Sequence, residues 1–92
     1  MKNVWIKGKL GYNEENDRYG LLLSDLWEHE GFRCGDSLQI LVDDQWIDTT
    51  MEITCIDGQD TWYLTGTEYR GKDLECLDAR IAIEDAISLN TR

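Results

Sequence analysis

Few side chains in this sequence could perform covalent or acid–base chemistry. The single histidine, His29, stands between two glutamates and five positions before Cys34. A thiol that attacks a substrate needs a base within hydrogen-bonding reach, and histidine is the usual base. A Cys34–His29 dyad oriented by a neighbouring acid is therefore the sharpest enzymatic hypothesis. Its spacing is arbitrary, and a chain of 92 residues offers neither an evident oxyanion loop nor a deep pocket, so we do not expect an enzyme.

Metal and cofactor binding are not expected either. The three cysteines, Cys34, Cys55 and Cys76, are too far apart in sequence to form a Cys-x2–4-Cys zinc motif. A single histidine cannot form the His-x3–5-His pair that such sites also use. The glycines at Gly8 and Gly11 lie within a strand pattern and precede no helix, which excludes a phosphate-binding loop. Because three thiols cannot all pair within one chain and no export signal is apparent, we expect them to be reduced and mostly buried.

Recognition is the better-supported class of function. The segment Asp25–Arg33 fits no strand alternation, yet it brings together Trp27, His29, Phe32 and Arg33. Large aromatic side chains beside polar groups are typical of binding surfaces. The segment is therefore a candidate partner surface. The alternative is that Trp27 and Phe32 fold back and plug one open end of the fold.

Two further aromatic residues are candidates for an exposed patch. Trp46 is out of phase with Ile47 and Met51 of its predicted strand, and Tyr63 is out of phase with Trp62. Because successive side chains of a strand point to opposite faces, this phase places Trp46 and Tyr63 on the outer face. They could form a binding patch, or a cross-strand pair that only stabilises the sheet.

The charge of the chain limits the partners that it can bind. Nineteen acidic against nine basic side chains give a net charge of −10, which repels nucleic acid and anionic membranes. One strand face carries Trp5, Lys7 and Lys9, and Arg18 is expected nearby across a hairpin. Aromatic rings and cations together are typical of proteins that bind single-stranded nucleic acid. These cations are too few to overcome the total charge. A protein partner with a basic surface is favoured; the second hypothesis is an acidic decoy that occupies the groove of a DNA-binding protein.

The elements that position these side chains are predicted to be strands. Apolar and polar residues alternate with a period of two along most of the chain, and polar or Asp-Gly turns separate the runs. Residues 24–35 interrupt the pattern and are predicted to be a long structured loop that can hold one helical turn. The last apolar run also has a helical alternative. The predicted strands are 4–12, 18–24, 37–42, 46–55, 61–65 and 77–83.

Short strands without helices between them predict an antiparallel meander, which protects its second face and its edges by curling into a barrel. We predict an all-β, partly open barrel of five to six strands over residues 1–84, of the size of Src-homology-3-like or oligonucleotide-binding folds. Residues 85–92 are a C-terminal tail or a short helical turn. No apolar run approaches the ~20 residues that span a membrane, so we expect a cytoplasmic protein. An unprotected edge strand could pair with the same strand of a second copy, so a homodimer is one alternative.

Short motifs spread along the chain carry a family resemblance. They are Gly8–Tyr12, Arg18-Tyr19, Ser24–Trp27, Cys34-Gly35, Leu38–Val42, Trp46 and Trp62–Leu64. Together they resemble a family of short bacterial proteins grouped as a domain of unknown function and often carried on plasmids, prophages and conjugative elements. The resemblance covers roughly Ile6 to Ile83 and implies no catalytic residue. The family pattern has an arginine after Thr49, where this chain has Thr50.

Overall fold

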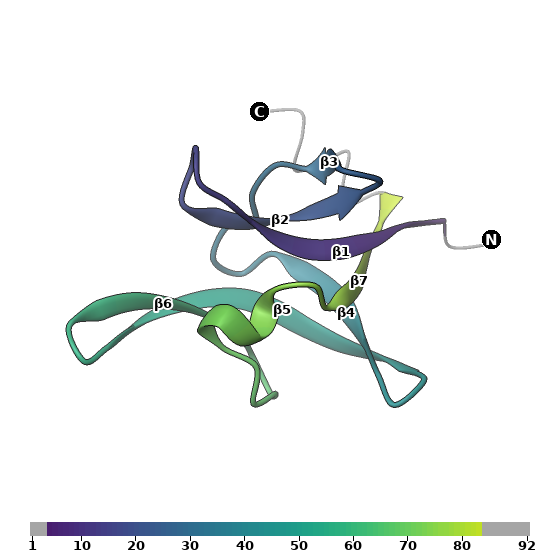
Figure 1. Cartoon of the computed structure of the whole chain (residues 1–92). Coiled ribbons are helices and arrows are strands. Elements are labelled where there is room, and N and C mark those ends of the chain that lie inside the picture. The colour runs from purple at the N-terminus through teal and green to yellow at the C-terminus, as the bar shows by residue number, and fades with distance from the viewer. Residues whose placement is uncertain (1–3, 84–92) are drawn as a thin grey trace.

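A computed structural model describes residues 4–83 as one seven-stranded antiparallel sheet that curls into a half-barrel (Figure 1). The strands are β1 (Trp5–Asn13), β2 (Arg18–Leu23), β3 (Leu26–His29), β4 (Ser37–Val42), β5 (Gln45–Ile56), β6 (Gln59–Leu64) and β7 (Asp78–Ala82), with a 3-10 turn, η1 (Gly71–Leu74), before the last. The prediction of an all-β, partly open barrel is confirmed, with one strand more than expected. The predicted tail, residues 85–92, lies outside the described residues.

The last strand joins the two halves of the sheet. β1, β2 and β3 form one antiparallel meander, and β4, β5 and β6 form a second. β7 lies between β1 and β4, where Ala79 pairs with Gly8 and Arg80 pairs with Gln39 (Figure 1). The prediction of a strand in this region is therefore confirmed, and its helical alternative is wrong.

Three hairpins turn on two residues with positive φ. They are Ser24-Asp25 (52° and 66°), Asp43-Asp44 (50° and 64°) and Asp57-Gly58 (51° and 80°). Two positive φ angles are the signature of a type I′ turn, whose twist matches that of the paired strands. The first of these turns sends the chain back along β2 as β3, so the long loop or helical turn predicted over residues 24–35 is wrong. Ser24 and Asp25 suit a helix cap as well as a turn, which explains the error.

The core lies inside the curl of the sheet. Leu23, Ile47 and Ile53 have the phase of inward positions in their strands but are exposed. One buried ring, Phe32, comes from the connection between β3 and β4. The buried apolar residues are Leu10, Tyr19, Leu21, Phe32, Leu38, Ile40, Met51, Leu64, Leu74, Ala79 and Ile81.

Two glycines allow the N-terminal meander to coil tightly. A Cβ atom at Gly8 would clash with the carbonyl oxygen of Leu22, and one at Gly20 would clash with the carbonyl oxygen of His29. Only a residue without a side chain permits backbones to approach this closely.

The cysteines are the clearest error of the sequence analysis. Cys34, Cys55 and Cys76 are all free thiols, and all three are exposed rather than buried. Cys55 lies in the part of β5 that pairs with β6 alone, and Cys76 has a φ of 66° in the turn before β7. Apolar character favours burial of a thiol, but these three positions lie outside the curl of the sheet.

Two leucines on adjacent strands test this description of the core. Leu21 in β2 is 0% exposed and Leu26 in β3 is 68% exposed. We expect Leu21→Ala to lower the free energy of unfolding by about 2–5 kcal/mol, because it leaves a cavity. The matched variant Leu26→Ala should change that energy by less than about 0.5 kcal/mol. Urea unfolding followed by tryptophan fluorescence measures both, and equal losses would contradict the placement of β3 at an exposed edge.

Candidate functional site

The outer face of the sheet carries a stack of three side chains from three strands. The guanidinium carbon of Arg80 in β7 lies 4.1 Å from the ring centroid of Trp5 in β1 and 4.2 Å from that of Trp46 in β5. Its Nε donates a hydrogen bond to Gln39 (2.8 Å), whose Nε2 donates one to Asp48 (2.6 Å). Within residues 4–83 the terminal amino groups of Arg80 have no hydrogen-bond acceptor. The stack therefore presents a fixed cation between two indole rings.

Strand register explains why these side chains meet. Ala79 and Ile81 are buried, so Arg80 between them points outward. Trp46 pairs with Leu41, which follows the buried Ile40 in β4, so Leu41 and Trp46 both point outward. The prediction that Trp46 lies on the outer face is confirmed, and its neighbour there is a guanidinium.

An apolar hollow of about 450 Å³ adjoins the stack. Leu22 and Leu23 of β2 form one wall, and Leu41 and Trp46 form the other. Lys7, Lys9 and Asp78 line it as well, and Lys9 Nζ forms an ion pair with Asp78 Oδ1 at 2.8 Å. The hydrogen bond from Lys9 to Asp78, helped by the attraction of the two charges, raises the pKa of Lys9. The hollow thus combines apolar walls with cations on a chain that is strongly acidic overall.

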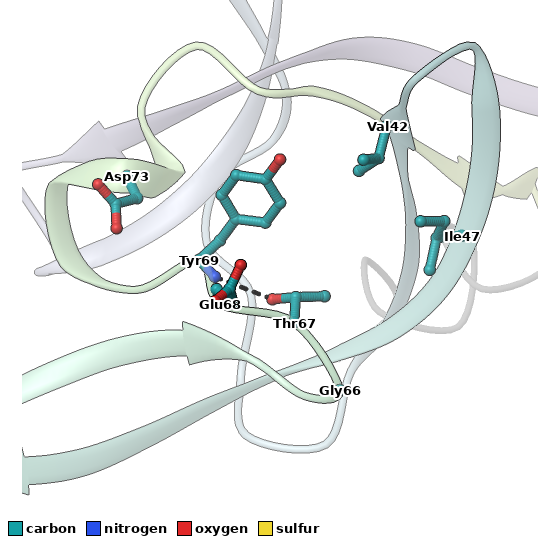
Figure 2. A pocket seen from close by; sticks show the side chains of 7 residues that line it. All are labelled: Val42, Ile47, Gly66, Thr67, Glu68, Tyr69 and Asp73. Atoms are coloured by element: carbon teal, nitrogen blue, oxygen red, sulfur yellow. Dashed lines mark hydrogen bonds between the residues drawn. The ribbon is translucent and has the colours of Figure 1, made fainter.

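A second hollow, of about 510 Å³, lies under the segment between β6 and η1 (Figure 2). Val42 and Ile47 form its apolar side, opposite Thr67 and Tyr69, and the backbone N–H of Tyr69 donates a hydrogen bond to Thr67 Oγ1 at 3.1 Å. Its lining includes carboxylates but no histidine, thiol or cation. No motif in the sequence predicts this hollow, because residues 66–75 have only the character of a polar connection.

A family model described as Domain of unknown function (DUF5348) matches residues 8–81. The chain belongs to this family. The match includes Arg80 and Trp46 of the outer-face stack, whereas Trp5 precedes it. Comparison with curated proteins and with solved structures finds no match. Among residues 4–83 of this DUF5348 chain, no helix has the length and apolar character needed to cross a membrane.

The aromatic segment predicted as a partner surface divides between the core and the surface. In this DUF5348 chain the rings of His29 and Phe32 are stacked, with centroids 4.4 Å apart, and the two residues are 4% and 0% exposed. Phe32 therefore folds back into the core, which is the alternative given above for this residue. Phe32 and His29 cannot form part of an exposed surface. Arg33 is exposed, and Trp27 is half-buried on the outer face, where it pairs with Leu22.

The other candidates are separated along the sheet. Trp46 and Tyr63 both point outward, but Trp46 is itself in β5, whereas Tyr63 pairs with Glu52 six positions further along that strand. Six residues of a strand span about 20 Å, so the two rings do not form one patch. Arg18 pairs with Asn13 at the far end of β1, away from Lys7 and Lys9. The expectation that Arg18 lies near these lysines is therefore wrong, whereas Trp5, Lys7 and Lys9 do occupy alternate positions on one face of β1.

Cys34 and His29 lie in different environments, one exposed and the other buried. The Nδ1 atom of His29 accepts a hydrogen bond from the backbone N–H of Gly31 at 3.2 Å. Its Nε2 atom is buried without a hydrogen-bond partner among the described residues, whereas Cys34 is exposed. In residues 4–83 no group of three or more His, Cys, Asp or Glu side chains could hold a metal ion.

The buried histidine predicts how stability depends on pH. Burial disfavours the imidazolium and lowers the pKa of His29 below 6.5. As the pH falls, His29 is protonated at a higher pH in the unfolded chain than in the folded chain. The free energy of unfolding therefore decreases below about pH 6.5 and becomes constant below the pKa of His29 in the folded chain. Urea unfolding from pH 7.5 to 5.5 measures this slope. His29→Gln should flatten it, and an unchanged slope in that variant would contradict the assignment.

Proposed function

We propose that this chain is a non-enzymatic docking module of a bacterial or mobile-element system, which acts in the cytoplasm by binding a protein partner through its outer face. The observation that carries the proposal is the stack of Arg80 between Trp5 and Trp46 beside an apolar hollow. The solvent face of an antiparallel sheet is normally polar. Two indole rings and the leucine side chains of the hollow give this face more apolar surface than the stability of the sheet requires.

The composition of the stack favours a binding role. Tryptophan and arginine are the residues most enriched among those that dominate binding energy at protein interfaces. Stacking fixes the planar guanidinium of Arg80 in advance, so less conformational entropy is lost when its terminal amino groups bind a carboxylate. The adjacent hollow, walled by Leu22 and Leu41, accepts an apolar side chain. The partner that fits offers an apolar side chain with a carboxylate close to it.

The charge of the rest of the surface determines how such a partner approaches. Many of the acidic side chains lie in hairpin turns, such as Glu14-Glu15 between β1 and β2 and Asp43-Asp44 between β4 and β5. A net charge of −10 attracts a protein with a basic surface and orients it before contact. Affinity then depends on the apolar and stacked contacts of the outer face.

The same charge supports a second candidate, a decoy that imitates nucleic acid and occupies a basic groove. The two functions differ in their response to salt. Binding through many carboxylates weakens steeply as ionic strength rises, because each ion pair is screened. Binding through the Trp5–Arg80–Trp46 stack and the hollow changes little, since apolar contacts are not screened. Salt dependence therefore separates the two functions.

Two outward-facing aromatic residues provide a matched pair of variants. Trp46 belongs to the stack, and Tyr63 lies near the opposite end of β5 on the same face. We expect Trp46→Ala to reduce partner retention at least about tenfold, as the loss of an interface anchor does, and Tyr63→Ala to leave it unchanged. Capture from native bacterial lysate by immobilised protein, with quantitative mass spectrometry of the retained proteins, measures the effect.

The capture is repeated at low and high salt with the wild-type chain. Retention that survives high salt and depends on Trp46 supports the docking module. Retention of DNA-binding proteins that is lost at high salt and is equal in both variants supports the decoy instead. Circular dichroism of each variant confirms that the sheet is intact before capture.

A further inference from the structure

The half-barrel has an open seam between β6, which is one edge of the sheet, and the turn of the β1–β2 hairpin. The sheet order ends in β3 and β6, so no ladder joins β6 to the β1–β2 hairpin. The seam is bridged by a side chain instead, because Trp62 Nε1 in β6 donates a hydrogen bond to the backbone carbonyl of Asp17 at 3.0 Å. Figure 1 shows β6 and the β1–β2 hairpin on the same side of the molecule. A hollow of about 440 Å³ lies at this seam.

Three aromatic rings line the hollow, and their polar ends are all hydrogen-bonded. The rings of Tyr12 and Tyr19 meet edge to face, with centroids 5.2 Å apart. The hydroxyl of Tyr12 donates to Asp17 Oδ1 (2.8 Å) and the hydroxyl of Tyr19 donates to the carbonyl of Gly71 (3.0 Å). Together with the bond from Trp62, these contacts fix all three rings. The hollow therefore has rigid π faces that need no rearrangement to bind a ligand.

The charged groups at the hollow are mainly acidic. Asp17 and Asp60 both line it, and Lys72 is the cation among its lining residues. Arg18 lies with its guanidinium carbon 5.9 Å from the ring centroid of Trp62, but it does not line the hollow. The ring of Trp62 thus already has a cation beside it within the fold. Aromatic faces and carboxylates both favour a positive charge, and an anion or a neutral ligand would gain little from this combination.

We infer that the seam hollow is a binding site for an organic cation, namely an alkylammonium or guanidinium group. Aromatic rings attract such cations through their negative π faces, and quaternary ammonium groups are the usual ligands of aromatic pockets. Asp17 and Asp60 add the attraction of a full negative charge. This site is separate from the Trp5–Arg80–Trp46 stack, so it goes beyond the proposed docking function and does not depend on it.

The structural alternative is that these contacts only hold the barrel closed, in which case no cation binds selectively. Titration of isotope-labelled protein with tetramethylammonium chloride and with acetyl-arginine amide, followed by amide and indole N–H NMR signals, tests the inference. We expect saturable shifts at the Trp62 indole N–H and at neighbouring backbone amides, because a cation over the rings changes the magnetic environment of both. Sodium chloride at equal ionic strength is the control ligand.

Two carboxylate variants show whether binding is local. Asp60→Asn removes a charge from the lining, and we expect it to weaken the binding of both cations by roughly three- to tenfold. Asp43→Asn removes an equal charge from the β4–β5 turn and should leave the affinity unchanged. Equal effects of the two variants, or shifts no larger than those with sodium chloride, would overturn the inference.

The source of the cation is distinguished by a third ligand. A glycine-flanked arginine pentapeptide presents the same guanidinium group on a peptide chain. Tighter binding of the pentapeptide than of acetyl-arginine amide assigns the hollow to a basic side chain of a protein. Equal binding assigns it to a free small cation. Because these measurements need only the purified chain, their result is independent of the lysate capture.

Discussion

The insertion of β7 between β1 and β4 is the constraint on which the rest of the structure depends. The two meanders have no other ladder between them, so a strand that comes late in the chain completes both the core and the outer surface. Ala79 and Ile81 fill the interior from this strand, and Arg80 between them enters the indole stack. A slip of one residue in its register would bury the guanidinium and expose both apolar side chains. Core packing and the position of the candidate site are therefore fixed together.

Much of the fold follows from the sequence because alternation with a period of two is a local signal. Each strand pattern indicates which residues share a face, and the faces of Trp46 and Ala79 follow from it. The pattern failed at residues 24–35, where Ser24-Asp25 suits a turn and a helix cap equally well, and the backbone takes the turn. The exposure of the cysteines was not predicted for another reason. The local sequence pattern determines the face of the sheet on which a residue lies, but its burial depends on where the sheet curls over it.

The candidate site is less predictable because it depends on strand order. Trp5, Arg80 and Trp46 come from the first, the last and the middle of the chain, and they become neighbours only after β7 has entered the sheet. A period of two places each of them on the outer face but does not say which strands are adjacent. For the same reason Arg18 and Lys9, which share a hairpin, were expected to be close, although the register pairs Arg18 with Asn13 at the end of β1 and Lys9 with Leu22 at its middle.

The few cations of this acidic chain bind indole rings more than carboxylates. Residues 4–83 contain one salt bridge, Lys9 to Asp78, whereas Arg80 and Arg18 lie over tryptophan rings. Exposed ion pairs contribute little to stability, and a guanidinium over an indole contributes a comparable or larger amount without neutralising a carboxylate. Among the acidic side chains of residues 4–83, Asp78 is the one that forms a salt bridge. The same arrangement that anchors the sheet preserves the long-range negative field through which a basic partner would be attracted.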